Sequence, residues 1–254
     1  MPTNDDAFRS LVACDYDLIA SQGVLLPTAR YYDSHILGSL PKRCGLVVDA
    51  GCGTGELTRR LSLRAERVLG VDISPVMVEM AKRAVPLANV EFQEAALEAL
   101  PRLLPPQSCS AIVASRVLHH CSDIPGVIPA LMELLEPGGR LVILDLDHVG
   151  SACSVPRRAA LWVLYIASVL LKGLISGKPL TALKDLGLER KAYASKGWQQ
   201  HLSHEPAFDR RQIDSALACA GAECSSSRLN WKVYLYVAVK RSSGSGASHD
   251  TVDS

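Results

Sequence analysis

The sequence lacks the spacings that mark metal or disulfide frameworks. It contains eight cysteines but no Cys-x-x-Cys pair, and no Cys and His residues stand at zinc-site spacing. The polar start, residues 1–9, lacks the apolar core of a secretory signal. We therefore expect free, mostly buried thiols in a reducing compartment, no bound metal, and a cytoplasmic location.

A clustered basic region is also lacking. The formal net charge is +1 at pH 7, and the Lys and Arg residues are scattered along the chain. Nucleic-acid binding usually requires a concentrated basic face, so we expect no nucleic-acid partner. Hydrophobic residues make up 48% of the chain, which is enough for a sizeable core.

No run of about 20 apolar residues, the length that spans a bilayer, is present. The nearest candidate covers residues 159–171, thirteen residues without a charge, and residues 159–177 continue it past Lys172. We rank a buried lid helix first and a helix lying weakly on a membrane surface second. A spanning helix ranks last.

Strand-like and helix-like segments alternate along most of the chain, as is typical of βαβ units around a mostly parallel sheet. The predicted strands cover residues 46–50, 67–72, 90–93, 111–115, 140–145 and 233–239. The predicted helices cover residues 54–63, 75–83, 127–135 and 210–220. Residues 1–40 are predicted as a helical lead-in, 41–240 as one domain with a helical insert at about 150–205, and 241–254 as a disordered tail.

The strongest local signal is a glycine turn between a strand and a helix, Val-Val-Asp-Ala-Gly-Cys-Gly-Thr-Gly-Glu at residues 47–56. Glycines permit positive φ and let a ligand lie against bare backbone. The spacing differs from the dinucleotide pattern, because the third glycine comes one residue early, at Gly55. Glu56 and Asp49 place negative charge there, which opposes a pyrophosphate and suits a cationic ligand.

Asp72 ends the second predicted strand, 23 positions after Asp49. A carboxylate at this point can accept two ribose hydroxyls, as the acidic residue of dinucleotide folds does. Capping of the following helix is the alternative role, but Ser74 already supplies a cap. We therefore favour ribose binding.

Residues 46–145 resemble the class I S-adenosylmethionine-dependent methyltransferases, and among them the ubiquinone/menaquinone-biosynthesis type with a type 11 methyltransferase domain. Four motifs in the expected order carry the resemblance: residues 47–55, residues 70–74 with Met77, residues 117–120 and residues 135–141. The resemblance implies an α/β, Rossmann-like, seven-stranded, mostly parallel sheet with helices on both faces and an inserted helical lid. It also implies S-adenosylmethionine as the cofactor.

The resemblance assigns roles to matching positions. The methionine part of the cofactor would lie against Asp49, Gly51, Cys52 and Gly53, and the ribose against Asp72. Adenine would contact Ile73, Met77, Ala96 and Leu97, and Ser115 would contact the amino-acid end through its backbone.

Two positions depart from the pattern. Ala96 stands where many relatives have Asp, with Glu94 or Glu98 as replacements, and Cys109-Ser110 stands where relatives often begin a strand with Asp.

His119 and His120 follow the fourth predicted strand, at the edge where α/β sheets place their ligands. Histidine suits proton removal near neutral pH, so either is a candidate general base. The alternative is that one packs in the core while the other contacts cofactor or acceptor. Asp145, Asp147 and His148 also lie close in sequence, and we interpret them as a solvated strand end rather than a metal site.

The sequence thus predicts methyl transfer to a small, hydrophobic acceptor, with oxygen or carbon preferred over nitrogen. Two alternatives stay open. One is a methyltransferase-like protein that binds the cofactor without methyl transfer, as a cyclase or a binding subunit. The other is a nicotinamide-dependent oxidoreductase, which the glycine spacing disfavours. The oligomeric state, the acceptor and the pathway are left undetermined.

Overall fold

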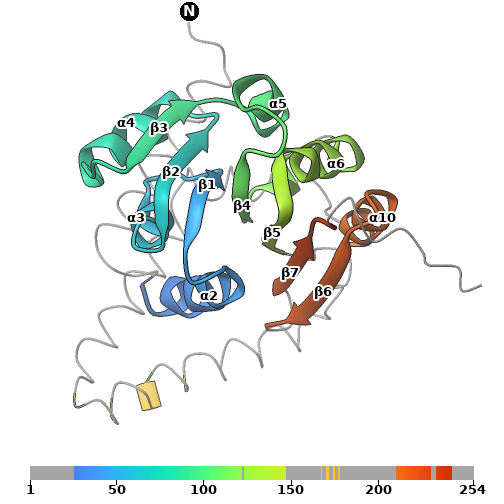
Figure 1. The fold of residues 1–254 in the computed structure, drawn as a ribbon. Coiled ribbons are helices and arrows are strands. Elements are labelled where there is room, and N and C mark those ends of the chain that lie inside the picture. The colour runs from blue at the N-terminus through green and yellow to red at the C-terminus, as the bar shows by residue number, and fades with distance from the viewer. Residues whose placement is uncertain are drawn as a thin grey trace, which may run out of the picture.

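The computed structural model describes residues 26–121, 123–146, 210–229 and 233–241, with residues 167, 170, 171, 174 and 177. These residues form one seven-stranded sheet in the order β3-β2-β1-β4-β5-β7-β6 (Figure 1). The first five strands in that order are parallel, whereas β7 runs antiparallel to both β5 and β6. The predicted Rossmann-like, seven-stranded, mostly parallel sheet is confirmed.

Strands and helices alternate up to the fifth strand, as the sequence predicted. The strands are β1 (Cys44–Ala50), β2 (Ala65–Asp72), β3 (Val90–Glu94), β4 (Cys109–Ser115), β5 (Leu135–Leu146), β6 (Glu223–Arg228) and β7 (Val233–Val239). The α-helices are α2 (Leu26–Ser39), α3 (Glu56–Leu61), α4 (Pro75–Ala84), α5 (Leu100–Leu103), α6 (Ile124–Leu134) and α10 (Arg211–Cys219). Two short 3₁₀ turns are η1 (Leu97–Ala99) and η2 (Leu118–His120).

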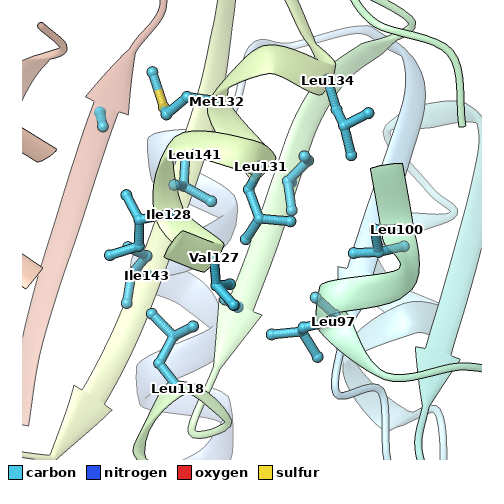
Figure 2. Packing of buried hydrophobic residues seen from close by; sticks show 14 of the residues in the cluster. Leu97, Leu100, Leu118, Val127, Ile128, Leu131, Met132, Leu134, Leu141 and Ile143 are labelled. Carbon is cyan, nitrogen blue, oxygen red and sulfur yellow. The ribbon is translucent and has the colours of Figure 1, made fainter. Parts of the chain in front are cut away.

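Two hydrophobic clusters lie on opposite faces of the sheet, because successive strand side chains alternate. Val48 on β1 belongs to a cluster with residues of α6 and α10, and Val47 belongs to one with Ile36 of α2 and Leu61 of α3. Figure 2 shows the first cluster, where α6 packs on β5 and reaches the η1 and α5 segment. Helices therefore cover both faces of the sheet.

Pro137-Gly138-Gly139 resembles a helix stop in the sequence, but α6 already ends at Leu134 and β5 includes these three residues. Gly138 N donates to the Lys240 carbonyl at 2.9 Å, and Lys240 N donates to the Gly139 carbonyl at 3.0 Å. These bonds keep the glycines in the sheet, and a register irregularity near Cys109 accommodates them. The helix α6 begins at Ile124, three residues before the predicted start at residue 127, so Pro129 lies inside it.

The edge strand β6 has no counterpart among the strands predicted from individual residues. All six residues, Glu-Cys-Ser-Ser-Ser-Arg, are exposed, so the segment lacks the alternating apolar pattern of a half-buried strand. It forms instead by antiparallel pairing with the strongly β-prone β7. Tertiary pairing here overrides local propensity.

Parts of three predicted segments lie outside the described residues. The lead-in is helical over 26–39, while residues 1–25 lie outside. Of the insert at 150–205 and the apolar segment 159–177 within it, only five residues are described, and four of these are helical: 167, 170, 171 and 174. The tail beyond residue 241 also lies outside. Among the described residues, no helix has the length and apolar character needed to cross a membrane.

Phe92 ties β3 to the glycine turn by lying over two glycines. A Cβ added to Gly70, its partner in the β2–β3 register, would stand 2.6 Å from the Phe92 ring. A Cβ on Gly55 would stand 3.1 Å from the tip of the same ring. The Phe92 ring therefore occupies space that is open only because neither glycine carries a side chain.

We predict that Gly70→Ala destabilises the protein by about 1–3 kcal/mol, because the new methyl group forces the Phe92 ring out of its position. Urea denaturation measures the change. The matched control is Gly38→Ala in α2, where an added Cβ meets nothing within 4 Å. That control gains up to about 1 kcal/mol from the lower backbone entropy of alanine. Equal stability of the two variants would contradict the packing argument.

Candidate functional site

The glycine turn between β1 and α3 adopts the backbone that only glycine favours. Gly51, Gly53 and Gly55 have φ of 76°, 53° and 83°. An added Cβ on Gly53 meets nothing within 4 Å, so this glycine faces open space. One on Gly51 would stand 2.6 Å from the Val117 side chain, so the turn after β4 lies directly against the loop. The loop is therefore bare backbone beside the carboxyl ends of β1 and β4.

Cys52, the predicted contact inside the loop, is buried and anchors it through its backbone. Its N–H and that of Gly51 both donate to the Val71 carbonyl, at 2.9 and 2.8 Å. Burial raises the pKa of the Cys52 thiol, and the carboxylates of Asp49 and Asp72 raise it further. The thiol stays protonated at neutral pH and acts as a small apolar group rather than a nucleophile.

Asp72 holds the loop and the next helix together. Its Oδ2 accepts the Gly53 N–H and its Oδ1 accepts the Ser74 N–H, both at 2.9 Å. Ser74 is the N-cap of α4 and accepts the Met77 N–H, as predicted. A carboxylate oxygen can accept more than one hydrogen bond, so Asp72 retains acceptor capacity for a ligand.

Asp49 is a carboxylate buried near the end of β1. Its side chain is 1% exposed, and Oδ2 accepts the Thr58 hydroxyl of α3 at 2.6 Å. Burial raises the pKa of Asp49 to about 7, against the lowering effect of the Thr58 hydrogen bond. The carboxylates of Asp33 and Asp72 raise it further, and Arg116 lowers it. A positively charged ligand at the loop would favour the ionised form.

An ionic network attaches the lead-in helix beside this carboxylate. Asp33 of α2 is 3% exposed and contacts Arg60 of α3 at 2.9 Å. Arg60 also contacts Glu56 at 3.1 Å, and Glu56 contacts Arg59 at 3.0 Å. Burial raises the pKa of Asp33, while Arg60 and Arg116 oppose that rise. Since Glu56 is neutralised by two arginines, the negative charge at the loop comes from Asp49 and Asp72.

The predicted adenine contacts lie near the carboxyl ends of β2 and β3. Ile73 is 48% exposed, which leaves an apolar side chain available to a ligand, and Met77 is half-buried on α4. Leu97, by contrast, is buried beside Leu100 and Val127 in the core, so only its backbone can face a ligand (Figure 2). Ala96 is half-buried immediately before η1.

The two replacement carboxylates proposed for the Ala96 departure are both exposed. Glu94 ends β3 directly opposite Asp72 in the sheet register, whereas Glu98 lies on η1. Glu94 is therefore the better placed of the two. At the other departure, Ser110 accepts the Gly45 N–H at 2.9 Å, so this position supports the sheet.

Ser115 ends β4 and is followed by a strained turn. Arg116 has φ of 57°, a conformation that non-glycine residues rarely adopt, and its N–H donates to the Leu144 carbonyl at 2.7 Å. Strain of this kind often accompanies functional sites. The turn directs Val117 against Gly51 and begins the η2 segment that carries both histidines.

The structure separates the two histidines. His119 is 3% exposed, and its Nδ1 lies 2.7 Å from Oδ1 of Asp145, which is 2% exposed. The His119 N–H donates to Oδ2 of the same carboxylate at 3.3 Å. His120 is exposed, and its ring centroid lies 4.0 Å from that of His119. The expectation that Asp145 is solvated is therefore wrong.

Sequence reasoning missed three contributors to this site: Asp145, Arg116, and the Asp33–Arg60 pair. One signal could have revealed Asp145, because it stands alone in the apolar segment 141–146, 26 positions after His119. A carboxylate in such a strand needs a partner. The neighbouring strand β4 ends at Ser115, and the two histidines follow it on η2.

The central part of the chain resembles known proteins. Residues 48–143 match the family model described as a methyltransferase domain. This central part of the chain is therefore similar to a methyltransferase domain. The resemblance stated from the sequence is confirmed, and the matched segment spans β1 to β5, with the glycine loop, Asp72 and both histidines.

Two curated relatives extend the comparison. A demethylmenaquinone methyltransferase of Tropheryma whipplei is 36% identical over 138 residues, which are 52% of this chain and 54% of the relative. A ubiquinone biosynthesis O-methyltransferase of Xylella fastidiosa is 26% identical over 195 residues, 73% of this chain and 77% of the relative. This chain thus spans about half the length of the first of them.

Solved structures support the fold. The DhpI–SAH complex superposes with a TM-score of 0.59 at 19% identity, over 92% of this chain and 94% of that chain. At this identity the likeness concerns the fold alone.

We predict that Arg60→Met destabilises the protein by about 3 kcal/mol, because it leaves the Asp33 carboxylate buried without its main partner. Thermal or urea unfolding measures the loss. The matched control is Lys82→Met, which breaks the Lys82–Glu79 pair, whose side chains are 50% and 57% exposed. Exposed pairs contribute at most about 1 kcal/mol, so the control stays near the wild type. Equal effects of both changes would refute the role of Asp33 burial.

Proposed function

We propose that this protein is an S-adenosylmethionine-dependent methyltransferase that acts on a small, apolar acceptor. The observation that carries the proposal is a loop of three glycines at positive φ, with the buried Asp49 and the half-buried Asp72 on adjacent strand ends. S-adenosylmethionine carries a sulfonium and an ammonium and has no phosphate. Its charge therefore suits this carboxylate pair.

In this proposal, different residues of the chain bind different parts of the cofactor. Asp49, Gly51, Cys52, Gly53 and the Ser115 backbone hold the amino-acid part. The ribose hydroxyls bind Asp72, which already orients the loop through Gly53. When bound, the cofactor supplies the electrophilic methyl group, and the protein supplies orientation and exclusion of water. Ile73, Met77, Ala96 and the Leu97 backbone flank adenine.

The proposal also covers the acceptor, the location of the protein and its partners. The relatives named for demethylmenaquinone and for ubiquinone biosynthesis support an apolar acceptor methylated on oxygen or carbon rather than nitrogen. We keep the cytoplasm as the location, because the described cysteines are free thiols. A weak membrane-surface contact through residues 159–177 and the absence of a nucleic-acid partner remain part of the proposal.

Calorimetric titration with S-adenosylmethionine, S-adenosylhomocysteine and NAD tests cofactor choice. We expect both sulfur ligands to bind, NAD not to bind, and Asp72→Asn to weaken binding by at least about tenfold, because one carboxylate acceptor is lost. Glu91→Gln on β3 is the matched carboxylate-to-amide control and leaves affinity unchanged. Binding of NAD alone would favour the oxidoreductase alternative.

A radiolabel transfer assay separates the enzyme from a protein that only binds the cofactor. We expect labelled methyl groups in apolar hydroxylated acceptors and none in polar metabolites. Tight binding without transfer to any acceptor would support a cyclase or a binding subunit. Transfer to polar metabolites alone would contradict the apolar-acceptor part of the proposal.

We predict that cofactor binding releases a proton from Asp49. Its pKa is raised to about 7 by burial, and a nearby cation lowers it, so the proton leaves between the bound pKa and about pH 7. Release approaches one proton near pH 6 and falls toward zero near pH 8. Calorimetry in buffers of different ionisation enthalpy counts these protons, and Asp49→Asn abolishes the release. Equal release from that variant would exclude Asp49 as the source.

A further inference from the structure

We infer that Arg210 and Arg228 bind a carboxylate on the acceptor, at a site two strands away from the end of β4. The inference rests on the proposed methyltransferase function and deepens it, because it names the class of acceptor: an apolar molecule with one acidic end. Neither arginine belongs to the residues that we assign to the cofactor. The site therefore selects the acceptor and leaves cofactor binding to the glycine loop.

The two guanidinium groups converge on one aromatic ring. The guanidinium carbon of Arg210 lies 4.6 Å from the centroid of the Tyr234 ring, and that of Arg228 lies 5.7 Å from it. The ring attracts each cation and restricts the orientations of the guanidinium groups. Side chains that are ordered in advance lose less conformational entropy when they bind an anion.

The pair lies at the edge of the sheet that also carries the proposed cofactor site. Asp145, Tyr234 and Arg228 oppose one another across β5, β7 and β6, so they form one row near the carboxyl end of β5. Arg210 is the N-cap of α10, and the buried residues of this helix share a hydrophobic cluster with Tyr234. Both arginines are thus placed where open α/β sheets bind their ligands.

Strand spacing gives the reach that an acceptor needs. In the sheet order, β7 is the second strand after β4 and β6 is the third (Figure 1). Neighbouring strands lie about 4.8 Å apart, so Tyr234 is about 10 Å across the sheet from β4 and Arg228 is about 14 Å from it. An acceptor that meets the cofactor near the end of β4 therefore reaches the arginines with a group roughly 10 Å from its reacting atom.

The local charge favours a monoanion. Arg210 contacts the Asp214 carboxylate at 3.5 Å, and the two side chains are 36% and 41% exposed. An exposed contact of this kind is weak and leaves the guanidinium able to bind a ligand. Together with Arg228, these groups carry one net positive charge, which a carboxylate neutralises. A guanidinium also matches a carboxylate in shape, because it can donate two parallel hydrogen bonds.

The first test measures equilibrium binding of three probes to protein saturated with S-adenosylhomocysteine. The probes are 4′-hydroxybiphenyl-4-carboxylate, its isomer 4′-hydroxybiphenyl-2-carboxylate, and the neutral 4-hydroxybiphenyl. We expect the first to bind at least roughly tenfold more tightly than either of the others, because only its carboxylate reaches the arginines. Equal binding of the first and the neutral probe would overturn the inference.

The second test compares the affinity ratio of the 4-carboxylate to the neutral probe among variants. Arg210→Gln and Arg228→Gln should each lower this ratio about fivefold or more, with unchanged affinity for S-adenosylhomocysteine. A purely structural role of either arginine would weaken both probes alike and leave the ratio unchanged, which would contradict the inference. Arg67→Gln on β2, an exposed arginine that contacts Glu91 at 3.3 Å, is the matched control and keeps the ratio.

Three further outcomes have a defined meaning. Tighter binding of the 2-carboxylate isomer would refute the distance argument, and an equal fall of the ratio in Arg67→Gln would refute a local site. Failure of S-adenosylhomocysteine to bind would count against the proposed function instead. The ratio measured without that ligand would then decide the carboxylate site by itself: its loss in both Arg210→Gln and Arg228→Gln supports the site, and its persistence overturns it.

Discussion

A carboxylate buried beneath the glycine loop governs the arrangement of the site. Asp49 lies on β1, one residue before the end of the strand, with Thr58 as its hydrogen-bond donor. Burying a carboxylate is costly unless it is paired or takes up a proton, and the raised pKa of Asp49 reports that cost. Two groups near the loop, Thr58 and Arg116, lower the pKa of Asp49 and so favour its ionised form. Arg116 approaches it through a strained turn, and a cationic ligand would complete its neutralisation.

The same constraint explains why a helix outside the matched domain belongs to the site. Residues 48–143 match the methyltransferase domain, yet Asp33 of α2 reaches the loop through Arg60. Asp33 raises the pKa of Asp49, and Arg60 favours the ionised form of Asp33 by pairing with it. The lead-in helix is thus coupled electrostatically to the carboxylate that faces the cofactor. Docking of α2 and affinity for a cation are linked through one set of charges.

Patterns that are local in sequence predicted much of this structure, and patterns that depend on tertiary contacts did not. The glycine loop, Ser74 as a helix cap and the alternation of strands follow from spacing within a few residues. The strand β6 carries no apolar alternation and exists because β7 pairs with it. The glycines at 138 and 139 look like a break, but they bond to Lys240, about a hundred residues away in sequence. Leu97 was predicted to contact adenine, but its side chain packs in the hydrophobic core.

The fate of Asp145 shows the same limit at the site. Asp147 and His148 follow it closely in sequence, which suggested a solvated strand end, whereas the parallel pairing of β4 and β5 brings Asp145 to His119. A buried carboxylate is costly unless hydrogen-bond partners surround it, and Asp145 meets both the backbone N–H and the ring Nδ1 of His119. These partners come from a neighbouring strand end, 26 positions earlier in the chain, so no pattern within a few residues of Asp145 could reveal them.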